Sequence, residues 1–510
     1  MNKYDFQKPT WLIIIGLVIL GMWITPGCSK VEETAVINPT LPLLPEVTPS
    51  ATLQLVSTPE ATFTEEATPI PTPVPLERPQ YEISAYLDYP NQQVIVEERI
   101  LFSNPAGKVL QEIDLVVPPN NWWGVFSIQE ITAGDLPLER YSLTGVKLNL
   151  VLGDPGWQPG ENLELRIQYT LNLPQQNALA GYGPSPFGYT SLQTNLVDWY
   201  PMVPPYQEDT GWLIHDPWIF GEYLVYPAAD FEVSLKLGTP GLIVAASAAP
   251  TAEGDPLHYS LTAARNFVFS ISPEYQVLEE DLNGVKVLGY IFPYYQGPGQ
   301  AAFEATLQAL ALYQDLYGPY QQPSLTMVQA DFNHGMEYEG LYFQSRGFFD
   351  LYAGSEKSYL VSIAVHETAH QWWYGQVAND QALEPWLDEA LCTFSELAYY
   401  EHAYPQSVDW WWSTRVNIYQ PTGRIDRSIY GFQEYDDQYL NYRNATYLQG
   451  AKFLAALKDQ MGDEAFYLFL KEYGTRNQDQ IATGEDFFQL LGEYLDFNEM
   501  DWLEEYFLLD

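Results

Sequence analysis

The pentapeptide at 366–370, His-Glu-Thr-Ala-His, constrains the fold of this 510-residue chain more than any other stretch. Positions i and i+4 of a helix share one face, so His366 and His370 can direct two imidazole nitrogens at one point. The flanking residues are strongly apolar, which predicts a buried helix, and buried polar side chains require partners. The pattern therefore predicts a core helix that carries part of a metal site.

Glu389 is the candidate for a third ligand. Eighteen residues separate it from His370, and the apolar spacing of its segment, 385–391, predicts a second helix packed against the first. Two imidazoles and one carboxylate form a ligand set for a single Zn²⁺ ion with an open fourth position. Glu367 lies beside the same point, where it can take a proton from metal-bound water. The alternative is a chance pentapeptide with two histidines on a helix surface.

The composition argues against two classes of partner. The chain has 66 acidic and 22 basic residues, a formal net charge of −44, so neither nucleic acid nor anionic lipid is expected as an electrostatic partner. Hydrophobic residues make up 46% and aromatic residues 15% of the chain, which suffices for the cores of two or three domains. The sequence leaves the oligomeric state open.

Residues 1–28 have the features of an export signal. Lys3 and Lys8 precede an apolar run at 11–24, which is too short for a comfortable membrane span. Cys28 follows a glycine at the end of this run, an arrangement that resembles the lipobox of bacterial lipoproteins, in which the cysteine receives the lipid. A lipid on Cys28 or an uncleaved signal anchor would each hold the chain at the membrane, on the extracytoplasmic side or cell surface.

Composition and periodicity divide the remaining chain into three parts. Residues 29–80 are rich in Pro, Thr and Glu and predict a disordered tether. Residues 81–275 alternate polar and apolar positions between Gly, Pro and Asn turns, which predicts an antiparallel β domain. Residues 276–510 turn to helical spacing after a short sheet and predict a mainly helical catalytic domain. The predicted fold class is α+β and multidomain.

Individual elements can be placed within these parts. Cys392 follows Glu389 by three residues, and we expect it to be a buried packing thiol rather than a ligand. The periodicity predicts strands at 81–87, 93–98, 163–169, 231–235, 285–292 and 324–329, and helices at 301–317, 385–400, 445–459, 463–473 and 484–495.

Three features resemble the gluzincin aminopeptidases, the membrane alanyl aminopeptidase family of zinc metallopeptidases. The first is H-E-x-x-H followed, after eighteen residues, by the glutamate of W-L-x-E, here Glu389. The second is a G-x-M-E-N segment before the zinc helix, for which this chain has Gly-Met-Glu-Tyr at 335–338. The third is a tyrosine in Y-x-K-G-A, for which Tyr447 is followed by Leu-Gln-Gly-Ala. The resemblance covers roughly 81–510 and departs at Tyr338, where the family has Asn.

The resemblance implies an N-terminal β saddle-like domain and a thermolysin-like catalytic domain. It also implies roles for six residues: zinc binding by His366, His370 and Glu389, proton transfer by Glu367, oxyanion stabilisation by Tyr447 and binding of the substrate α-amine by Glu337.

These features predict a zinc metallopeptidase, and in particular an aminopeptidase that trims peptides outside the cell. One alternative is a gluzincin endopeptidase or another hydrolase that uses the same zinc site without amine binding. A second is a catalytically silent binding protein of the same fold. The presence of every expected ligand, of the base and of the candidate tyrosine favours an enzyme.

Overall fold

The computed structural model describes residues 76–508 apart from 177–185, 253, 334 and 496–500. The predicted signal at 1–28, Cys28 and most of the predicted tether lie outside the described residues. Among the described residues, no helix is both long and apolar enough to span a membrane. All of them belong to one compact unit, so the predicted boundary between residues 275 and 276 stays a prediction.

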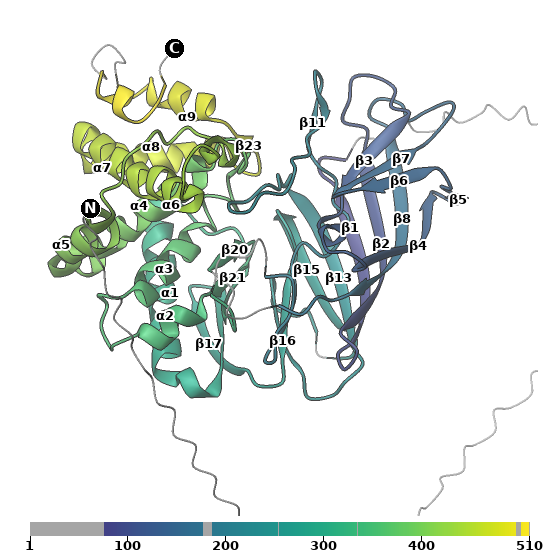
Figure 1. The fold of residues 1–510 in the computed structure, drawn as a ribbon, viewed down its shortest axis with the longest axis horizontal. Coiled ribbons are helices and arrows are strands. Elements are labelled where there is room, and N and C mark those ends of the chain that lie inside the picture. Colours follow the sequence, from purple (N-terminus) through teal and green to yellow (C-terminus); the bar gives the residue numbers. More distant parts are fainter. Residues whose placement is uncertain (1–75, 177–185, 253, 334, 496–500, 509–510) are drawn as a thin grey trace, which may run out of the picture. The chain divides into compact units, whose positions relative to one another are not determined.

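The N-terminal part is built from β-strands (Figure 1). Its largest sheet has seven strands in the order β15-β13-β1-β2-β8-β4-β5, and the same region contains sheets β14-β16-β10-β9 and β3-β7-β6 and the hairpin β11-β12. The bounds are β1 Gln80–Asp88, β2 Gln93–Ser103, β3 Glu112–Val116, β4 Phe126–Ala133, β5 Leu136–Pro137, β6 Tyr141–Thr144, β7 Lys147–Val151, β8 Asn162–Asn172, β9 Gly188–Tyr189, β10 Thr194–Leu196, β11 Tyr206–Gln207, β12 Gly211–Trp212, β13 Ala229–Leu237, β14 Ile243–Ala246, β15 Leu257–Ala264 and β16 Phe269–Ser272.

The alternating sequence of β1 is reproduced by its burial. Tyr81, Ile83, Ala85 and Leu87 are buried in the core and the residues between them face outward. The prediction of a purely antiparallel domain is wrong in one ladder, because β1 pairs with β13 in parallel. The two strands are far apart in the chain, which leaves room for the crossover that a parallel pair requires.

The C-terminal part begins with a five-stranded mixed sheet in the order β17-β18-β19-β21-β20. β18 pairs with β19, and β19 with β21, in parallel. Every residue of β19 is buried, as expected for a strand that is covered on both faces of its sheet. The bounds are β17 Gln276–Leu282, β18 Val285–Ile291, β19 Ser324–Gln329, β20 Met336–Tyr338 and β21 Leu341–Gln344.

This mixed sheet separates two cores. Val328 and Phe343 pack into the core of the β region, whereas Leu325, Met327 and Tyr342 pack into the core formed with the helices. Helices α1 and α3 accordingly lie on one side of the sheet and the β region on the other (Figure 1). The sheet therefore fixes the metal-site helix relative to loops of the β region.

The predicted helices are present with shifted ends. The helix expected at 445–459 starts as a π-helical turn, Asn444–Gln449, and continues as α7. The bounds are α1 Gln296–Tyr317, α2 Arg346–Leu351, α3 Tyr359–Ala369, α4 Trp386–Ala403, α5 Val408–Trp410, α6 Gln438–Arg443, α7 Gly450–Met461, α8 Asp463–Arg476 and α9 Gly484–Leu491, with a second π-helical turn at Trp411–Val416 and a short parallel pair between β22 Ala378–Asn379 and β23 Ile481–Ala482.

Candidate metal centre and active-site cleft

Helix α3 begins at a serine cap and ends within the H-E-x-x-H motif. The Ser358 hydroxyl accepts a hydrogen bond from the N–H of Val361, which satisfies one of the free donors of the first turn. The helix ends at Ala369, and His370, the second histidine of the motif, is its C-cap. His370 nevertheless keeps helical backbone angles, and its N–H donates to the carbonyl of His366 at 3.4 Å. Both imidazoles therefore point to the same side.

Helix α4 brings Glu389 against this pair and completes a triangle of donor atoms. The Nε2 atoms of His366 and His370 are 3.2 Å apart, and Oε2 of Glu389 lies 3.2 Å from the first and 3.7 Å from the second. Tetrahedral zinc with bonds of about 2.0–2.1 Å places its ligand atoms about 3.3 Å apart. The three residues fit one zinc ion without rearrangement.

In each imidazole, Nδ1, which is not part of the triangle, lies near a hydrogen-bond acceptor. Nδ1 of His366 lies 3.1 Å from Oε1 of Glu396, and Nδ1 of His370 lies 3.2 Å from the carbonyl oxygen of Trp373. With both Nδ1 atoms donating, the two Nε2 lone pairs and the Glu389 oxygen converge on one point. Three acceptors at this spacing repel one another unless a cation lies between them.

The two rings differ in their affinity for protons. Burial lowers the pKa of His370 to about 4, so this ring is neutral near pH 7. Burial also disfavours a charge on His366, but the carboxylates of Glu389 and Glu396 outweigh it and raise the pKa to about 10. A metal ion at this site must therefore displace a proton from His366.

Glu396, which was not predicted from the sequence, orients His366 through the contact with Nδ1, the ring nitrogen that faces away from the metal triangle. Its Oε2 accepts hydrogen bonds of 2.9 Å from Arg415 Nε and Trp411 Nε1, and its Oε1 accepts one of 2.8 Å from Arg415 Nη2. Burial opposes ionisation, but the charge of Arg415 and the hydrogen bond with His366 lower the pKa of this carboxyl below its ordinary value. Its position seven residues after Glu389 on α4, two helical turns on, was the available sequence signal.

Glu367 has the environment of a general base. Its Oε2 is buried and has no hydrogen-bond partner among the described residues. Burial raises its pKa to about 8, although the nearby His366 opposes the shift. Gly335 makes room for this carboxylate, because a Cβ at position 335 would collide with Oε1 of Glu367. The glycine of the 335–338 segment is therefore explained by contact with the base.

Tyr447 reaches the same centre from the π-helical turn that precedes α7. Its hydroxyl donates to Oε1 of Glu389, and its ring is nearly parallel to the His366 ring, with centroids 6.0 Å apart. π-helical turns often occur at functional sites, because they redirect a side chain within a helix. The phenol is placed to donate a hydrogen bond to an oxygen near the metal position.

Glu337 and Glu222 form an acidic pair beside the triangle. Carboxylate oxygens of Glu222, Glu337 and Glu389 lie within 4.8 Å of one another. Gln381 donates to Oε1 of Glu337 at 3.3 Å and to Asp388 at 2.9 Å. Burial and then the neighbouring carboxylates raise the pKa of Glu337 well above its ordinary value and that of Glu222 to about 8. Such a cluster favours a positively charged ligand.

Glu222 is the second residue that the sequence analysis missed. It lies in the connection before β13, in the β region, whereas Glu337 lies in β20. No motif or spacing marks it, because its approach to the metal site depends on how the β region packs against the mixed sheet. Only the tertiary structure identifies it.

A cleft of about 570 Å³ contains the site. Apolar side chains line part of it, including the exposed Ile219 and Leu351. Every predicted site residue except Cys28, which lies outside the described residues, lines this cleft: Glu337, His366, Glu367, His370, Glu389 and Tyr447.

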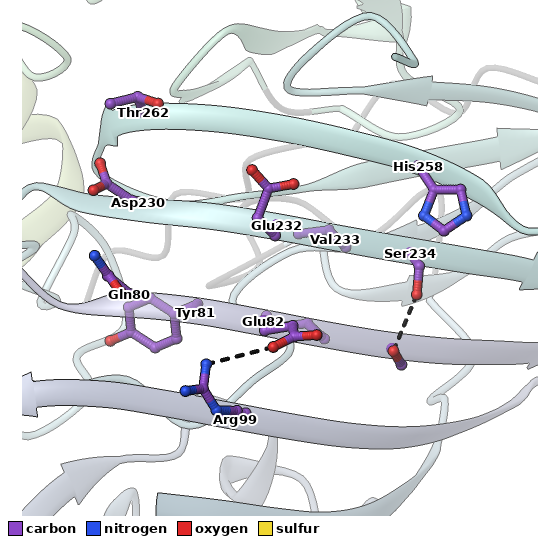
Figure 2. A pocket seen from close by; sticks show the side chains of 12 residues that line it. Gln80, Tyr81, Glu82, Arg99, Asp230, Glu232, Val233, Ser234, His258 and Thr262 are labelled. Carbon is purple, nitrogen blue, oxygen red and sulfur yellow. Dashed lines mark hydrogen bonds and ion pairs between the residues drawn. The ribbon is translucent and has the colours of Figure 1, made fainter. Parts of the chain in front are cut away.

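A second concavity, of about 630 Å³, lies on strands β1, β2, β13 and β15 (Figure 2), and none of the three residues of the metal triangle lines it. Two pairs of its polar side chains bind each other: Arg99 binds Glu82 at 3.4 Å, and Ser234 donates to Ser84 at 3.1 Å. We assign no function to it.

Cys392 is a packing residue, as expected. It is completely buried, and its Sγ lies 3.8 Å from the carbonyl oxygen of Trp373. Burial raises the pKa of its thiol well above the ordinary value, which disfavours the thiolate that a metal would require.

The triangle of two histidines and one glutamate, with a further glutamate beside it, is a donor set suited to a hydrolytic zinc site. Residues 301–506 match the family model described as the Peptidase family M1 domain. This match supports the resemblance to the gluzincin aminopeptidases that the sequence predicted, and zinc is the metal that the match and the donor residues indicate.

Part of the chain is also similar in sequence to known aminopeptidases. The chain is 29% identical to human endoplasmic reticulum aminopeptidase 2 over 217 residues, 38% of this chain and 22% of that protein. It is 25% identical to aminopeptidase N of Lactobacillus delbrueckii subsp. lactis over 217 residues, 38% of this chain and 24% of that protein. The matched region thus spans about a quarter of these relatives. The M1 zinc metallopeptidase of Deinococcus radiodurans has the same fold, with a TM-score of 0.57, 17% identity and coverage of 83% of this chain and 93% of that one.

Proposed function

We propose that this protein is a zinc-dependent aminopeptidase that removes N-terminal residues from peptides. The observation that carries the proposal is the position of the Glu222–Glu337 pair next to the metal triangle. A buried acidic pair binds a protonated α-amine through charge-assisted hydrogen bonds, which an internal peptide bond cannot offer. The scissile bond of a peptide held in this way lies close to the triangle.

The residues of the centre have complementary roles in hydrolysis. A zinc ion held by His366, His370 and Glu389 would acidify a water molecule and polarise the scissile carbonyl. Glu367, with a pKa of about 8, accepts the proton of the attacking water and delivers it to the leaving amine. Tyr447 donates its phenolic hydrogen to the oxygen that becomes negative as the bond is attacked.

Hydrolysis of a short peptide with a free N-terminus, compared with its N-acetylated form, tests this function. We expect the free peptide alone to be cleaved and Glu367→Ala to abolish cleavage. Glu337→Gln should lower kcat/KM for the free peptide by about 10- to 100-fold, because one charge-assisted bond to the amine is lost. Equal cleavage of both peptides would instead indicate an endopeptidase, and stoichiometric zinc without turnover would indicate a binding protein.

The remaining features extend the proposal. The β region and the helical region are proposed to be saddle-like and thermolysin-like domains, on the basis of the sequence resemblance. The lipobox-like sequence at Cys28 and the composition of residues 29–80 support a lipid anchor and a tether that hold the enzyme outside the cytoplasmic membrane. Metabolic labelling with a radioactive fatty acid, lost on Cys28→Ala, tests the anchor.

A further inference from the structure

Arg443 is a cation in the cleft wall that has no carboxylate partner among the described residues. It ends α6, one helical turn before Tyr447. Its Nη2 donates to Oδ1 of Asn444 at 2.9 Å, and its buried Nε has no hydrogen-bond partner. The other arginine of the cleft, Arg415, is already bound to Glu396 by two hydrogen bonds.

The guanidinium of Arg443 is held in place by stacking. It lies 4.0 Å from the centroid of the Tyr419 ring. The Tyr419 hydroxyl lies 2.9 Å from that of Tyr359, which in turn donates to the carbonyl of Thr414 at 3.2 Å. Stacking uses the face of a guanidinium and leaves its N–H edges available for a planar, bidentate acceptor such as a carboxylate.

The cleft therefore has opposite charges on different parts of its wall. Carboxylate oxygens of Glu222 and Glu337 lie within 4.8 Å of one of Glu389, whereas Arg443 stacks on Tyr419. Arg443 precedes Tyr447 by one helical turn. Each residue of an extended peptide spans about 3.3–3.6 Å, so a peptide of two or three residues is long enough to reach from the site at Tyr447 to Arg443. The charges are complementary to a short peptide that has an amine at one end and a carboxylate at the other.

We propose that Arg443 binds a carboxylate on the leaving-group side of the scissile bond. This inference rests on the proposed aminopeptidase function, because the acidic pair must take the substrate amine for Arg443 to lie on the other side. The carboxylate can be the free C-terminus of a short peptide or an acidic side chain in a longer one. The preferred substrates are accordingly short or acidic peptides.

Four peptides distinguish the sources of this carboxylate with the full-length, zinc-loaded protein. They are Leu-Ala-Ala with a free C-terminus, the same peptide as its C-terminal amide, Leu-Ala-Asp amide and Glu-Ala-Ala amide. We expect kcat/KM for the free acid to exceed that for its amide about tenfold or more, mainly through KM, since a bond between two charges is lost in the amide. A preference for Leu-Ala-Asp amide over Leu-Ala-Ala amide would show that an acidic side chain can also provide the carboxylate.

Arg443→Gln should bring the ratio between acid and amide close to one. Arg443→Lys should give an intermediate ratio, because lysine keeps the charge but loses the bidentate geometry. Arg427→Gln is the matched control: Arg427 stacks on Tyr435 at 5.6 Å but does not line the cleft, so the ratio should remain that of the unaltered protein.

Two results would overturn the inference while leaving the aminopeptidase in place. One is equal hydrolysis of Leu-Ala-Ala, its amide and Leu-Ala-Asp amide by the unaltered protein, a comparison that needs no variant to fold. The other is a higher kcat/KM for Glu-Ala-Ala amide than for Leu-Ala-Ala amide that disappears in Arg443→Gln. This result would mean that Arg443 binds a carboxylate on the residue being removed. If none of the four peptides is hydrolysed, the proposed function and this inference are overturned together.

Discussion

Glu98 in the β region and Glu396 behind the metal site are both 0% exposed, yet their surroundings are opposite. Glu396 accepts hydrogen bonds from Arg415 and Trp411 and contacts His366, whereas neither oxygen of Glu98 has a hydrogen-bond partner among the described residues. The pKa of Glu396 is accordingly below its ordinary value despite burial, and burial raises the pKa of Glu98 well above it.

The difference shows that the surroundings of a buried carboxyl in this protein determine whether its ionised or its neutral form is favoured. Near the metal, a carboxylate is kept ionised by a fixed cation, so that it can orient a ligand. In the β core, burial favours the neutral form of the Glu98 carboxyl, and no cation compensates a charge there. Three substitutions test this contrast, and the first should have the largest effect.

Arg415→Leu should destabilise the protein by about 3–5 kcal/mol, because it leaves the charge of Glu396 buried without its cation. Urea unfolding of the zinc-free protein measures the change. Arg424→Leu is the control, since Arg424 pairs with Asp426 in a partly exposed position and its loss should cost about 1 kcal/mol or less. Equal losses in the two variants would mean that Glu396 does not depend on Arg415.

Glu98→Gln should stabilise the protein at pH 7 by roughly 1–3 kcal/mol, because burial opposes the ionisation that is free to occur in the unfolded chain. The unfolded pKa is near 4.5, so below that pH both states are protonated and the gain disappears. As the pH rises above it, the natural protein loses stability relative to the variant. Unfolding measured at pH 4 and pH 7 checks this, and a less stable variant at pH 7 would reveal an unrecognised partner of Glu98.

Glu396→Gln should weaken zinc binding by about 10- to 100-fold, since the orientation and basicity of His366 depend on this carboxylate. Competition with a chelator measures the affinity. Glu401→Gln is the matched control on the same helix, where Glu401 pairs with Lys458 away from the metal triangle. Unchanged affinity in Glu396→Gln would remove Glu396 from the metal centre.

The sequence by itself determined the local parts of the protein. Alternation in the N-terminal half predicted the strands, and the i, i+4 spacing and the helix around Glu389 predicted the three candidate metal ligands that the structure brings together. It also held an unused signal for Glu98, which occupies an inward position of β2 between the buried Val96 and Ile100. These patterns are readable because a period of two or 3.6 residues depends only on neighbours in the chain.

The tertiary structure alone decided the features that join distant segments. These are the parallel pairing of β1 with β13, the approach of Glu222 to Glu337 and the position of Arg443 in the cleft. The first joins two strands of the β region, and the other two depend on how the β region and the helices pack on opposite faces of the mixed sheet. Packing of this kind is specified by contacts between residues more than a hundred positions apart, which leave no period or motif in the sequence.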